Sequence, residues 1–207
     1  KQAKHFAKNI GINHVIINLE ETKIENFSKN SIDRCYYCKK ELFSKIKQVA
    51  LEKRLDYILD GSNFDDIKDY RPGIKALKEL GVISPLKDVG LTKKEIRELS
   101  RDIGLNTWDK PSFACLASRF PYGIKITKSR LKKIEEAESF LHYCGVRQYR
   151  VRYHIEIARI ETSKNDFKLV LKHSDEIIKK FKELGFKYIT LDIEGYRTGS
   201  LNEVIKK

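Results

Sequence analysis

Two rhythms of hydrophobic and polar positions divide the chain. In its first half, short apolar runs rich in β-branched residues alternate with stretches whose apolar positions recur at helical spacing. The runs predict strands at residues 14–19, 56–61 and 82–86. The periodic stretches predict helices at residues 36–54, 74–80 and 92–103. Thr92 and Glu95 form a predicted capping box at the start of the last helix.

This alternation predicts an α/β fold with a Rossmann-like parallel sheet over residues 1–117. Ligands bind such a sheet outside the carboxyl ends of its strands. Here those ends are followed by a polar, aperiodic loop at residues 20–33, by Asp60-Gly61 and by the segment after Ser84-Pro85. We therefore expect the binding crevice along these loops.

The second half, residues 118–207, has a different order of elements. Its pattern predicts a helix, two strands, a second helix and a last strand, which is typical of a smaller α+β domain with an antiparallel or mixed sheet. The helices are expected at residues 127–143 and 166–184, and the strands at residues 147–153, 155–161 and 188–193. A hinge rich in Pro, Ser and Gly joins the halves at residues 109–123.

Charge and length narrow the classes of function. The 207 residues carry a net charge of +13. Such a surface attracts the phosphates of nucleotides, nucleic acids or lipids, or it is simply a solvated, lysine-rich face. No apolar run has the length of a membrane span or of a signal-peptide core, so we expect a cytoplasmic protein without membrane contact. The chain opens at Lys1 in a helical pattern, and we expect further residues before it.

The four cysteines include a C-x-x-C pair at the start of a predicted helix, Cys35 and Cys38. Thiols three residues apart can face one metal, and we expect the helix N-terminus and nearby cations to favour their thiolate form. A further ligand is needed, and Cys115 or Cys144 can supply it. Three thiolates leave one iron of a [4Fe–4S] cluster open, which suits a reactive site. The alternative is a pair of ordinary thiols.

Cys115 lies in the hinge, where a side chain can face a pocket. Lys110 and Arg119 are close in sequence, and we expect them to lower the pKa of this thiol. Cys115 is then either a catalytic residue or an inert loop thiol. Cys144 ends an amphipathic helix, and we interpret it as a packed thiol.

Arginines on the second half predict anion binding. Arg119 follows Ser118 in the hinge, and Arg150 and Arg152 share one face of a predicted strand. A guanidinium group matches the geometry of phosphate or carboxylate. A solvated strand face is the alternative.

Taken together and in order, the motifs of this chain resemble the LarE family, ATP-dependent sulfur transferases of the PP-loop pyrophosphatase superfamily. The resemblance covers nearly the whole chain. The motifs are Arg34-Cys-Tyr-Tyr-Cys-Lys-Lys-Glu-Leu-Phe43, Asp60-Gly-Ser-Asn63, Asp69-Tyr-Arg-Pro-Gly73, Ser84-Pro-Leu86, Trp108-Asp-Lys-Pro111, Cys115-Leu-Ala-Ser-Arg-Phe-Pro-Tyr-Gly123, Ala158-Arg-Ile-Glu161 and Leu191-Asp-Ile-Glu-Gly-Tyr-Arg-Thr-Gly-Ser-Leu-Asn-Glu203.

The resemblance implies a reaction and its partners. ATP adenylates a carboxylate of pyridinium-3,5-dicarboxylate mononucleotide, and a sulfur nucleophile then displaces AMP to leave a thiocarboxylate. Repeated on the second carboxylate, this gives the pincer ligand of a nickel cofactor. The family binds pyrophosphate with a Ser-Gly-Gly-x-Asp-Ser loop, which these 207 residues lack and which we expect before Lys1. Family membership also implies a homo-oligomer.

The family supplies sulfur in two ways. In one, the hinge cysteine gives up its own sulfur and becomes dehydroalanine. In the other, three cysteines hold a [4Fe–4S] cluster that carries sulfide from an external donor. Because Cys35, Cys38 and Cys115 occur together here, the chain resembles the cluster type, with a sacrificial Cys115 as the alternative.

The same resemblance implies roles for further residues. The mononucleotide phosphate would be held by Ser118, Arg119, Arg150 and Arg152. Mg²⁺ or another divalent metal would be held by Glu138, Glu161 and Asp166. Tyr36 and Tyr37 stand where sacrificial members have a Trp, so stacking on the pyridinium ring is not implied for them.

Two other functions fit parts of the sequence. A tRNA 2-thiolation enzyme of the same superfamily would also use three cysteines and a basic surface. It would carry flanking zinc-ribbon C-x-x-C pairs, which this sequence lacks. A non-enzymatic nucleic-acid-binding module would show a basic stripe with stacking aromatic residues on one element, which the sequence also lacks.

Overall fold

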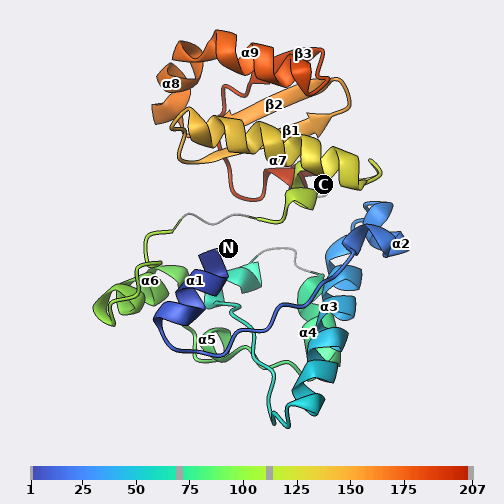
Figure 1. The fold of residues 1–207 in the computed structure, drawn as a ribbon, viewed down its shortest axis with the longest axis vertical. Coiled ribbons are helices and arrows are strands. Elements are labelled where there is room, and N and C mark those ends of the chain that lie inside the picture. Colours follow the sequence, from blue (N-terminus) through green and yellow to red (C-terminus); the bar gives the residue numbers. More distant parts are fainter. Residues whose placement is uncertain (1, 69–71, 111–113, 205–207) are drawn as a thin grey trace.

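A computed structural model describes residues 2–68, 72–110 and 114–204. Residues 69–71 of one predicted motif and residues 111–113 of the hinge lie outside them. In Figure 1, α7 (Lys128–Tyr143), the strands, α8 (Phe167–Lys172) and α9 (Ser174–Glu183) lie together at one end of the molecule. At the other end lie α1 (Gln2–Asn9), α3 (Arg34–Glu52), α4 (Gly73–Glu79), α5 (Pro85–Asp88) and α6 (Lys93–Asp102). The structure therefore mixes helices and strands, as an α/β fold requires.

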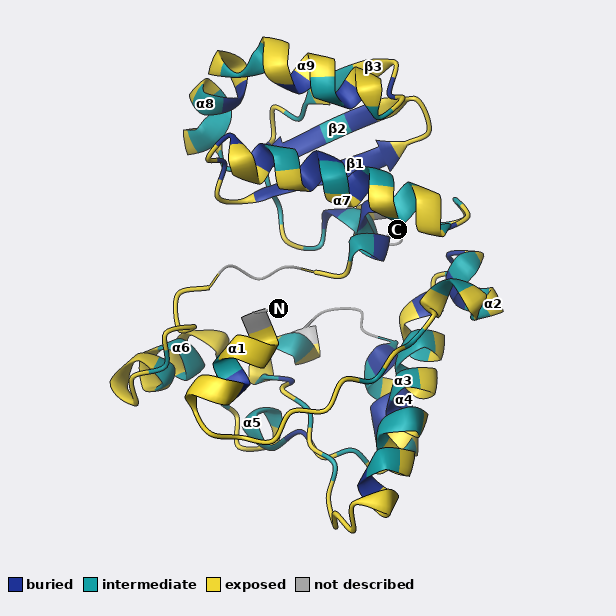
Figure 2. Cartoon of the chain, in the orientation of Figure 1, coloured by how far each residue is buried: buried dark blue, intermediate teal, exposed yellow. Residues whose placement is uncertain are grey.

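The second half contains a three-stranded mixed sheet, in agreement with the prediction. Strand β1 (Tyr149–His154) pairs antiparallel with β2 (Ile157–Thr162), and β2 pairs parallel with β3 (Tyr188–Leu191). Helix α7 packs on β1 and on α9, and α9 packs on β3. Alternate residues of β1, such as Val151, enter the hydrophobic core, which Figure 2 shows as the buried faces of these elements.

The predicted helix over residues 166–184 is wrong in one respect, because the structure divides it into α8 and α9 at His173. His173 leaves the helical conformation, with φ −97° and ψ 19°, and α9 begins at Ser174. Asp175 and Glu176 stand in the first turn of α9, where negative charge favours a new helix N-terminus.

The strand predictions of the first half are not borne out as strands. Residues 14–19 form no β-structure, and Val15 and Ile16 are exposed. A β-strand needs backbone hydrogen bonds to a neighbouring strand. Among the described residues of the first half, the predicted parallel sheet is reduced to a single bridge between Leu59 and Ile83. The loop predicted at residues 20–33 instead contains a 3-10 turn at Glu21–Lys23 and the short helix α2 (Glu25–Ser28).

Helix α2 belongs to the packing of the second half. Phe27 is only 4% exposed and joins the core formed by α7, the sheet and α9. Backbone bonds continue the contact, since the N–H of Ile126 donates to the carbonyl of Ser28 at 2.8 Å. The segment that leads into α3 is thereby fixed against the end of the hinge.

Among the described residues, no helix is both long enough and apolar enough to cross a bilayer.

Candidate functional site

The start of α3 is anchored to the hinge through Asn30. This side chain is fully buried, and its Nδ2 donates to the carbonyl of Pro121 at 2.6 Å and to that of Phe120 at 3.3 Å. Its Oδ1 accepts a short hydrogen bond from Arg34, the first residue of α3. The guanidinium of Arg34 also lies 5.2 Å from the centre of the Tyr122 ring. The C-x-x-C turn therefore has a fixed place beside the hinge.

This anchoring brings three thiols into one region, although in the described structure their sulfur atoms do not all lie within 4.8 Å of one another. Cys35 and Cys38 lie in the first turns of α3, as predicted, and Cys115 lies just before the 3-10 turn at Leu116–Arg119. Burial raises the pKa of Cys38 to about 12, and repulsion from Cys115 and Cys35 adds to the shift. The expectation that the helix N-terminus would favour the thiolate is wrong for Cys38, because burial and its two thiol neighbours outweigh it.

The pKa of Cys115 is also raised rather than lowered. Desolvation of the thiol is the main cause, although the residue as a whole is exposed. The N–H of Ala117 and the charge of Arg34 act in the opposite direction. Among the main contributions to this pKa, Arg34 is the cation that lowers it, and its sequence distance from Cys115 gave no sign of this role.

Immediately after Cys115, Arg119 enters a buried ion pair with α7. Its Nε lies 2.6 Å from Oε1 of Glu138, and its Nη2 lies 3.1 Å from Oε2. The remaining nitrogen, Nη1, donates to the hydroxyl of Ser118 at 2.9 Å and to the carbonyl of Ala114 at 3.2 Å. Both side chains of the pair are nearly inaccessible. Arg119 therefore ties the backbone just before Cys115 to the 3-10 turn just after it.

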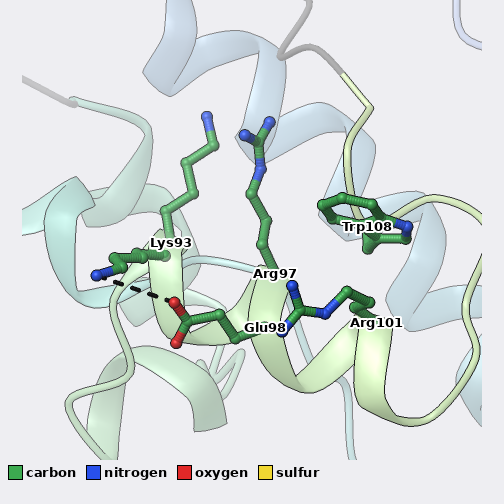
Figure 3. Close-up of a pocket in the computed structure, with 6 residues that line it drawn as sticks. Lys93, Arg97, Glu98, Arg101 and Trp108 are labelled. Atoms are coloured by element: carbon green, nitrogen blue, oxygen red, sulfur yellow. Dashed lines mark ion pairs between the residues drawn. The ribbon is translucent and has the colours of Figure 1, made fainter.

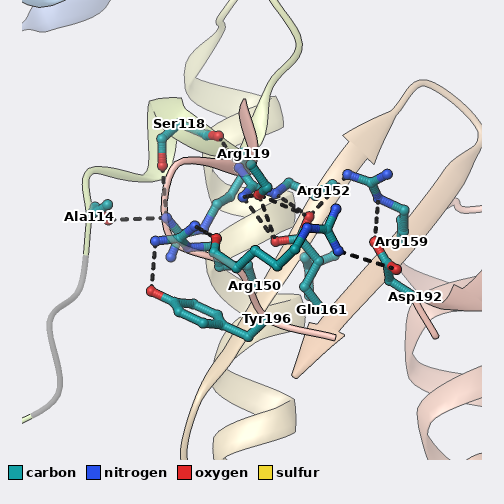
Figure 4. A network of polar contacts seen from close by, with 12 residues as sticks. Ala114, Ser118, Arg119, Arg150, Arg152, Arg159, Glu161, Asp192 and Tyr196 are labelled. Carbon is teal, nitrogen blue, oxygen red and sulfur yellow. Dashed lines mark hydrogen bonds and ion pairs between the residues drawn. The ribbon is translucent and has the colours of Figure 1, made fainter. Parts of the chain in front are cut away.

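The polar face of the sheet holds a second ion pair. Arg152 of β1 lies opposite the core, and its Nε and Nη2 each lie 2.9 Å from the carboxylate of Glu161 on β2. Its Nη1 donates to the carbonyl of Ser118 at 2.6 Å, and Nη2 also donates to Ser200 Oγ at 2.6 Å. Glu161 is paired as well with Arg159, 3.0 Å away. Figure 4 shows how these groups converge next to the hinge.

Arg150 differs from its neighbours because, in the described part of the chain, it makes no ion pair. Its Nη1 and Nη2 donate to neutral oxygens, the carbonyl of Arg197 at 3.2 Å and the hydroxyl of Tyr196 at 2.7 Å. Among the described residues no carboxylate lies within ion-pair distance of it. Burial lowers the pKa of Arg150, and repulsion from Arg152 and Arg119 adds to the shift, while Tyr196 and Glu161 act against it. An anion bound here would relieve that repulsion.

The three carboxylates of the predicted metal site are held apart in this structure. Glu138 and Glu161 are paired with arginines, and Glu138 also accepts the N–H of Val151 at 2.9 Å. Asp166 precedes α8 and is half-buried. In the described part of the chain, their oxygens do not gather within 4.8 Å of one another. These residues as they stand do not fit a metal ion, and their metal role remains a prediction.

A depression of about 380 Å³ lies elsewhere, along α6. Figure 3 shows its cationic wall, with Lys93, Arg97 and Arg101 around Trp108 and with Glu98 paired to Lys94. No predicted site residue lines it. Basic side chains on an exposed helix are common in so basic a chain, so the candidate site remains at the hinge.

Sequence reasoning assigned no role to Asn30, Arg34, Tyr196 or Ser200, all of which position the site. Arg34, Tyr196 and Ser200 stand in motifs that carry the family resemblance, and Arg34 also directly precedes the C-x-x-C pair. Asn30, Tyr196 and Ser200 act through contacts across 39 to 91 residues, which no local pattern reports.

Known proteins are similar to this chain over most or all of its length. No protein-family model matches the chain. An uncharacterized protein of Synechocystis sp. is 41% identical over all of this chain and 78% of its own length. Pyridinium-3,5-bisthiocarboxylic acid mononucleotide synthase of Lactiplantibacillus plantarum is 34% identical over all of this chain and 75% of its own length. The chain belongs to the LarE family. An uncharacterized protein of Methanocaldococcus jannaschii is 37% identical over 88% of this chain and 71% of its own length.

Proposed function

We propose that this LarE-family protein is an ATP-dependent sulfur transferase that converts a carboxylate of pyridinium-3,5-dicarboxylate mononucleotide into a thiocarboxylate. The name of the Lactiplantibacillus plantarum relative supplies the product class. The observation that carries the proposal is the buried Arg150, which makes no ion pair among the described residues and lies in the polar network beside the hinge that carries Cys115 (Figure 4).

Arg150 is the residue that binds the mononucleotide phosphate most directly in this proposal. Arg119 is paired with Glu138, and Arg152 is paired with Glu161. These two arginines therefore add positive charge and rigidity, but few of their N–H groups are available to a phosphate. Ser118 lies between them, with its hydroxyl on Arg119 and its carbonyl on Arg152. A phosphate beside Arg150 would gain a charge-assisted hydrogen bond and would offset the surplus positive charge.

Cys35, Cys38 and Cys115 would hold a [4Fe–4S] cluster. Iron ions bind thiolates and compensate their charge, so a cluster suits a site that carries several neighbouring thiols. When bound, the cluster supplies an open iron that accepts sulfide from an external donor. The protein contributes position: Asn30 and Arg34 fix the turn that carries Cys35 and Cys38, and Arg119 fixes the backbone of Cys115.

ATP activates the carboxylate in this proposal, because a carboxylate is a poor electrophile until it carries a leaving group. A divalent metal at Glu138, Glu161 and Asp166 has no part in this proposal, because arginines already pair with Glu138 and Glu161. Free thiols at the site suit a reducing compartment, so we place the reaction in the cytoplasm, in a homo-oligomer.

The test is sulfur transfer followed by mass spectrometry. The full-length protein is reconstituted anaerobically and given the mononucleotide, ATP and sulfide. We expect replacement of carboxylate oxygen by sulfur over several turnovers, with Cys115 still present as cysteine. Dehydroalanine at position 115 after a single turnover would instead assign the sulfur to Cys115 itself. No thiocarboxylate under any of these conditions would refute the proposed function.

A further inference from the structure

A second group of metal-ligand side chains involves none of the residues proposed for sulfur transfer. Cys144 ends α7, His173 stands at the break between α8 and α9, and Glu176 lies in the first turn of α9. One donor atom from each side chain lies within 4.8 Å of the other two. Two elements separated by the whole sheet hairpin therefore bring a thiol, an imidazole and a carboxylate to one point.

The spacing of these donors is close to that of a tetrahedral zinc site. The bond lengths of zinc to nitrogen and oxygen, about 2.0–2.2 Å, place neighbouring ligands about 3.3 Å apart in a tetrahedron. The Nδ1 of His173 and the Oε2 of Glu176 are already 3.2 Å apart. A thiolate ligand stands slightly farther away because its bond to zinc is about 2.3 Å. The thiol of Cys144 lies within 4.8 Å of a ring nitrogen of His173 and of a carboxylate oxygen of Glu176, so a shift of roughly one ångström suffices for binding.

The local fold holds the three donors in place. Gly145 ends α7 with φ +86°, a conformation that glycine adopts without strain, and turns the chain directly after Cys144. Leu169 of α8 packs against this turn, 3.8 Å from where a Cβ on Gly145 would stand. The break at His173 then directs its ring toward Glu176. The break between α8 and α9 therefore brings His173 next to Glu176.

The three side chains differ in their exposure to solvent. Cys144 is buried at 7% exposure, while the side chains of His173 and Glu176 are 27% and 61% exposed. An ion can thus enter from the Glu176 side, and water can fill a fourth position. A set of one sulfur, one nitrogen and one oxygen suits a borderline-soft ion such as Zn²⁺ and disfavours Mg²⁺ and Ca²⁺, which take oxygen ligands.

We propose that Cys144, His173 and Glu176 form a Zn²⁺ site with a water as fourth ligand. On binding, Cys144 releases its proton to solvent and coordinates as a thiolate, His173 binds as neutral imidazole and Glu176 as carboxylate. The ion joins the end of α7 to the α8–α9 junction. Metal binding at these three residues can be measured directly, so its test does not depend on sulfur transfer.

Cobalt(II) is the probe, since a cysteine-bound tetrahedral Co²⁺ absorbs in both the near-ultraviolet and the visible. The titration uses a Cys35→Ser/Cys38→Ser/Cys115→Ser protein, in which Cys144 is the remaining thiol. We expect one equivalent of Co²⁺ to produce a sulfur-to-cobalt absorption band, and Zn²⁺ to abolish it. Adding Cys144→Ser should remove the band, and adding His173→Ala or Glu176→Gln should weaken Co²⁺ binding at least tenfold. His142→Ala, a change of the exposed histidine two residues before Cys144, should leave binding unaltered.

A band that persists after Cys144→Ser, or the absence of a band in a folded triple variant, would overturn the site. Should the triple variant fail to fold, zinc content per chain is compared between the wild-type protein and Cys144→Ser after metal loading and dialysis. Loss of one zinc per chain in the variant supports the site, and equal zinc in both proteins refutes it.

Discussion

The Nδ2 of Asn30 donates to the carbonyl of Pro121 at 2.6 Å, across 91 residues of chain. Asn30 has a left-handed backbone with φ +55°, which an asparagine tolerates better than most residues. Its buried amide fills the space between the start of α3 and the hinge, and it also binds Arg34. This one side chain therefore determines where the C-x-x-C pair stands relative to Cys115.

Replacing Asn30 with Gly should separate these elements. Gly keeps the left-handed backbone and removes only the side chain, which leaves Arg34 and the Pro121 carbonyl without their buried partner. We expect a loss of about 1–3 kcal/mol in the free energy of unfolding and a lower iron content after reconstitution. Asn30→Ala should cost about 1 kcal/mol more, because a Cβ strains this conformation. Chemical denaturation and iron analysis measure both effects, and wild-type stability in Asn30→Gly would contradict the anchoring role.

The pair of Arg119 and Glu138 makes a separate prediction about stability. Glu138→Gln leaves the buried guanidinium without its counterion, so we expect the free energy of unfolding to fall by about 3–5 kcal/mol. The double variant Arg119→Met/Glu138→Leu should recover much of this loss, because two apolar side chains leave no charge unpaired. Equal destabilisation in the single and double variants, measured by denaturant unfolding, would contradict this account of the pair.

Arg150 should matter less for stability. It makes no ion pair among the described residues and is held by hydrogen bonds to neutral oxygens, so Arg150→Met should lower the melting temperature far less than Glu138→Gln does. The same change removes a charge-assisted hydrogen bond to phosphate, and affinity for the mononucleotide should fall about 10- to 100-fold. Calorimetric titration measures the affinity. The matched control is Arg147→Met, a change of an exposed arginine just before the same strand. Unaltered affinity in Arg150→Met would remove Arg150 from the phosphate site.

Thiol reactivity of the metal-free protein tests the surroundings of Cys38. A pKa of about 12 keeps Cys38 protonated at pH 8, and the thiolate is the form that reacts. Alkylation of Cys38 should therefore be about 100-fold or more slower than in the unfolded chain, where a cysteine has a pKa of about 8.5. Raising the pH toward 12 should abolish the difference. Peptide mapping after brief iodoacetamide treatment gives the rates, and equal rates in folded and unfolded protein at pH 8 would contradict the shift.

The features that could be predicted from sequence are the local ones. Thr92 caps α6 through the expected capping box with Glu95, and the amphipathic pattern correctly gave α7. Strand formation at residues 14–19 depends on a distant backbone partner, so an apolar run alone did not decide it. The break at His173 also escaped the pattern, since apolar positions continue through it.

The candidate site shows the same division. The period of two correctly placed Arg150 and Arg152 on one face of β1, and the helical spacing placed Cys35 and Cys38 on one turn. The pairing of Arg119 with Glu138 and the anchoring by Asn30 are tertiary contacts between distant segments. Such contacts decide which arginine remains free for an anion, and only the folded chain reports that.

Iron content after anaerobic reconstitution tests the central claim most directly, namely that Cys35, Cys38 and Cys115 form one cluster site. The account predicts a brown protein with about four irons per chain. Changing any one of the three thiols to Ser should remove most of this iron, while Cys144→Ser should retain it. A colourless protein whose thiols remain intact, or an equal loss of iron in Cys144→Ser, would contradict the claim.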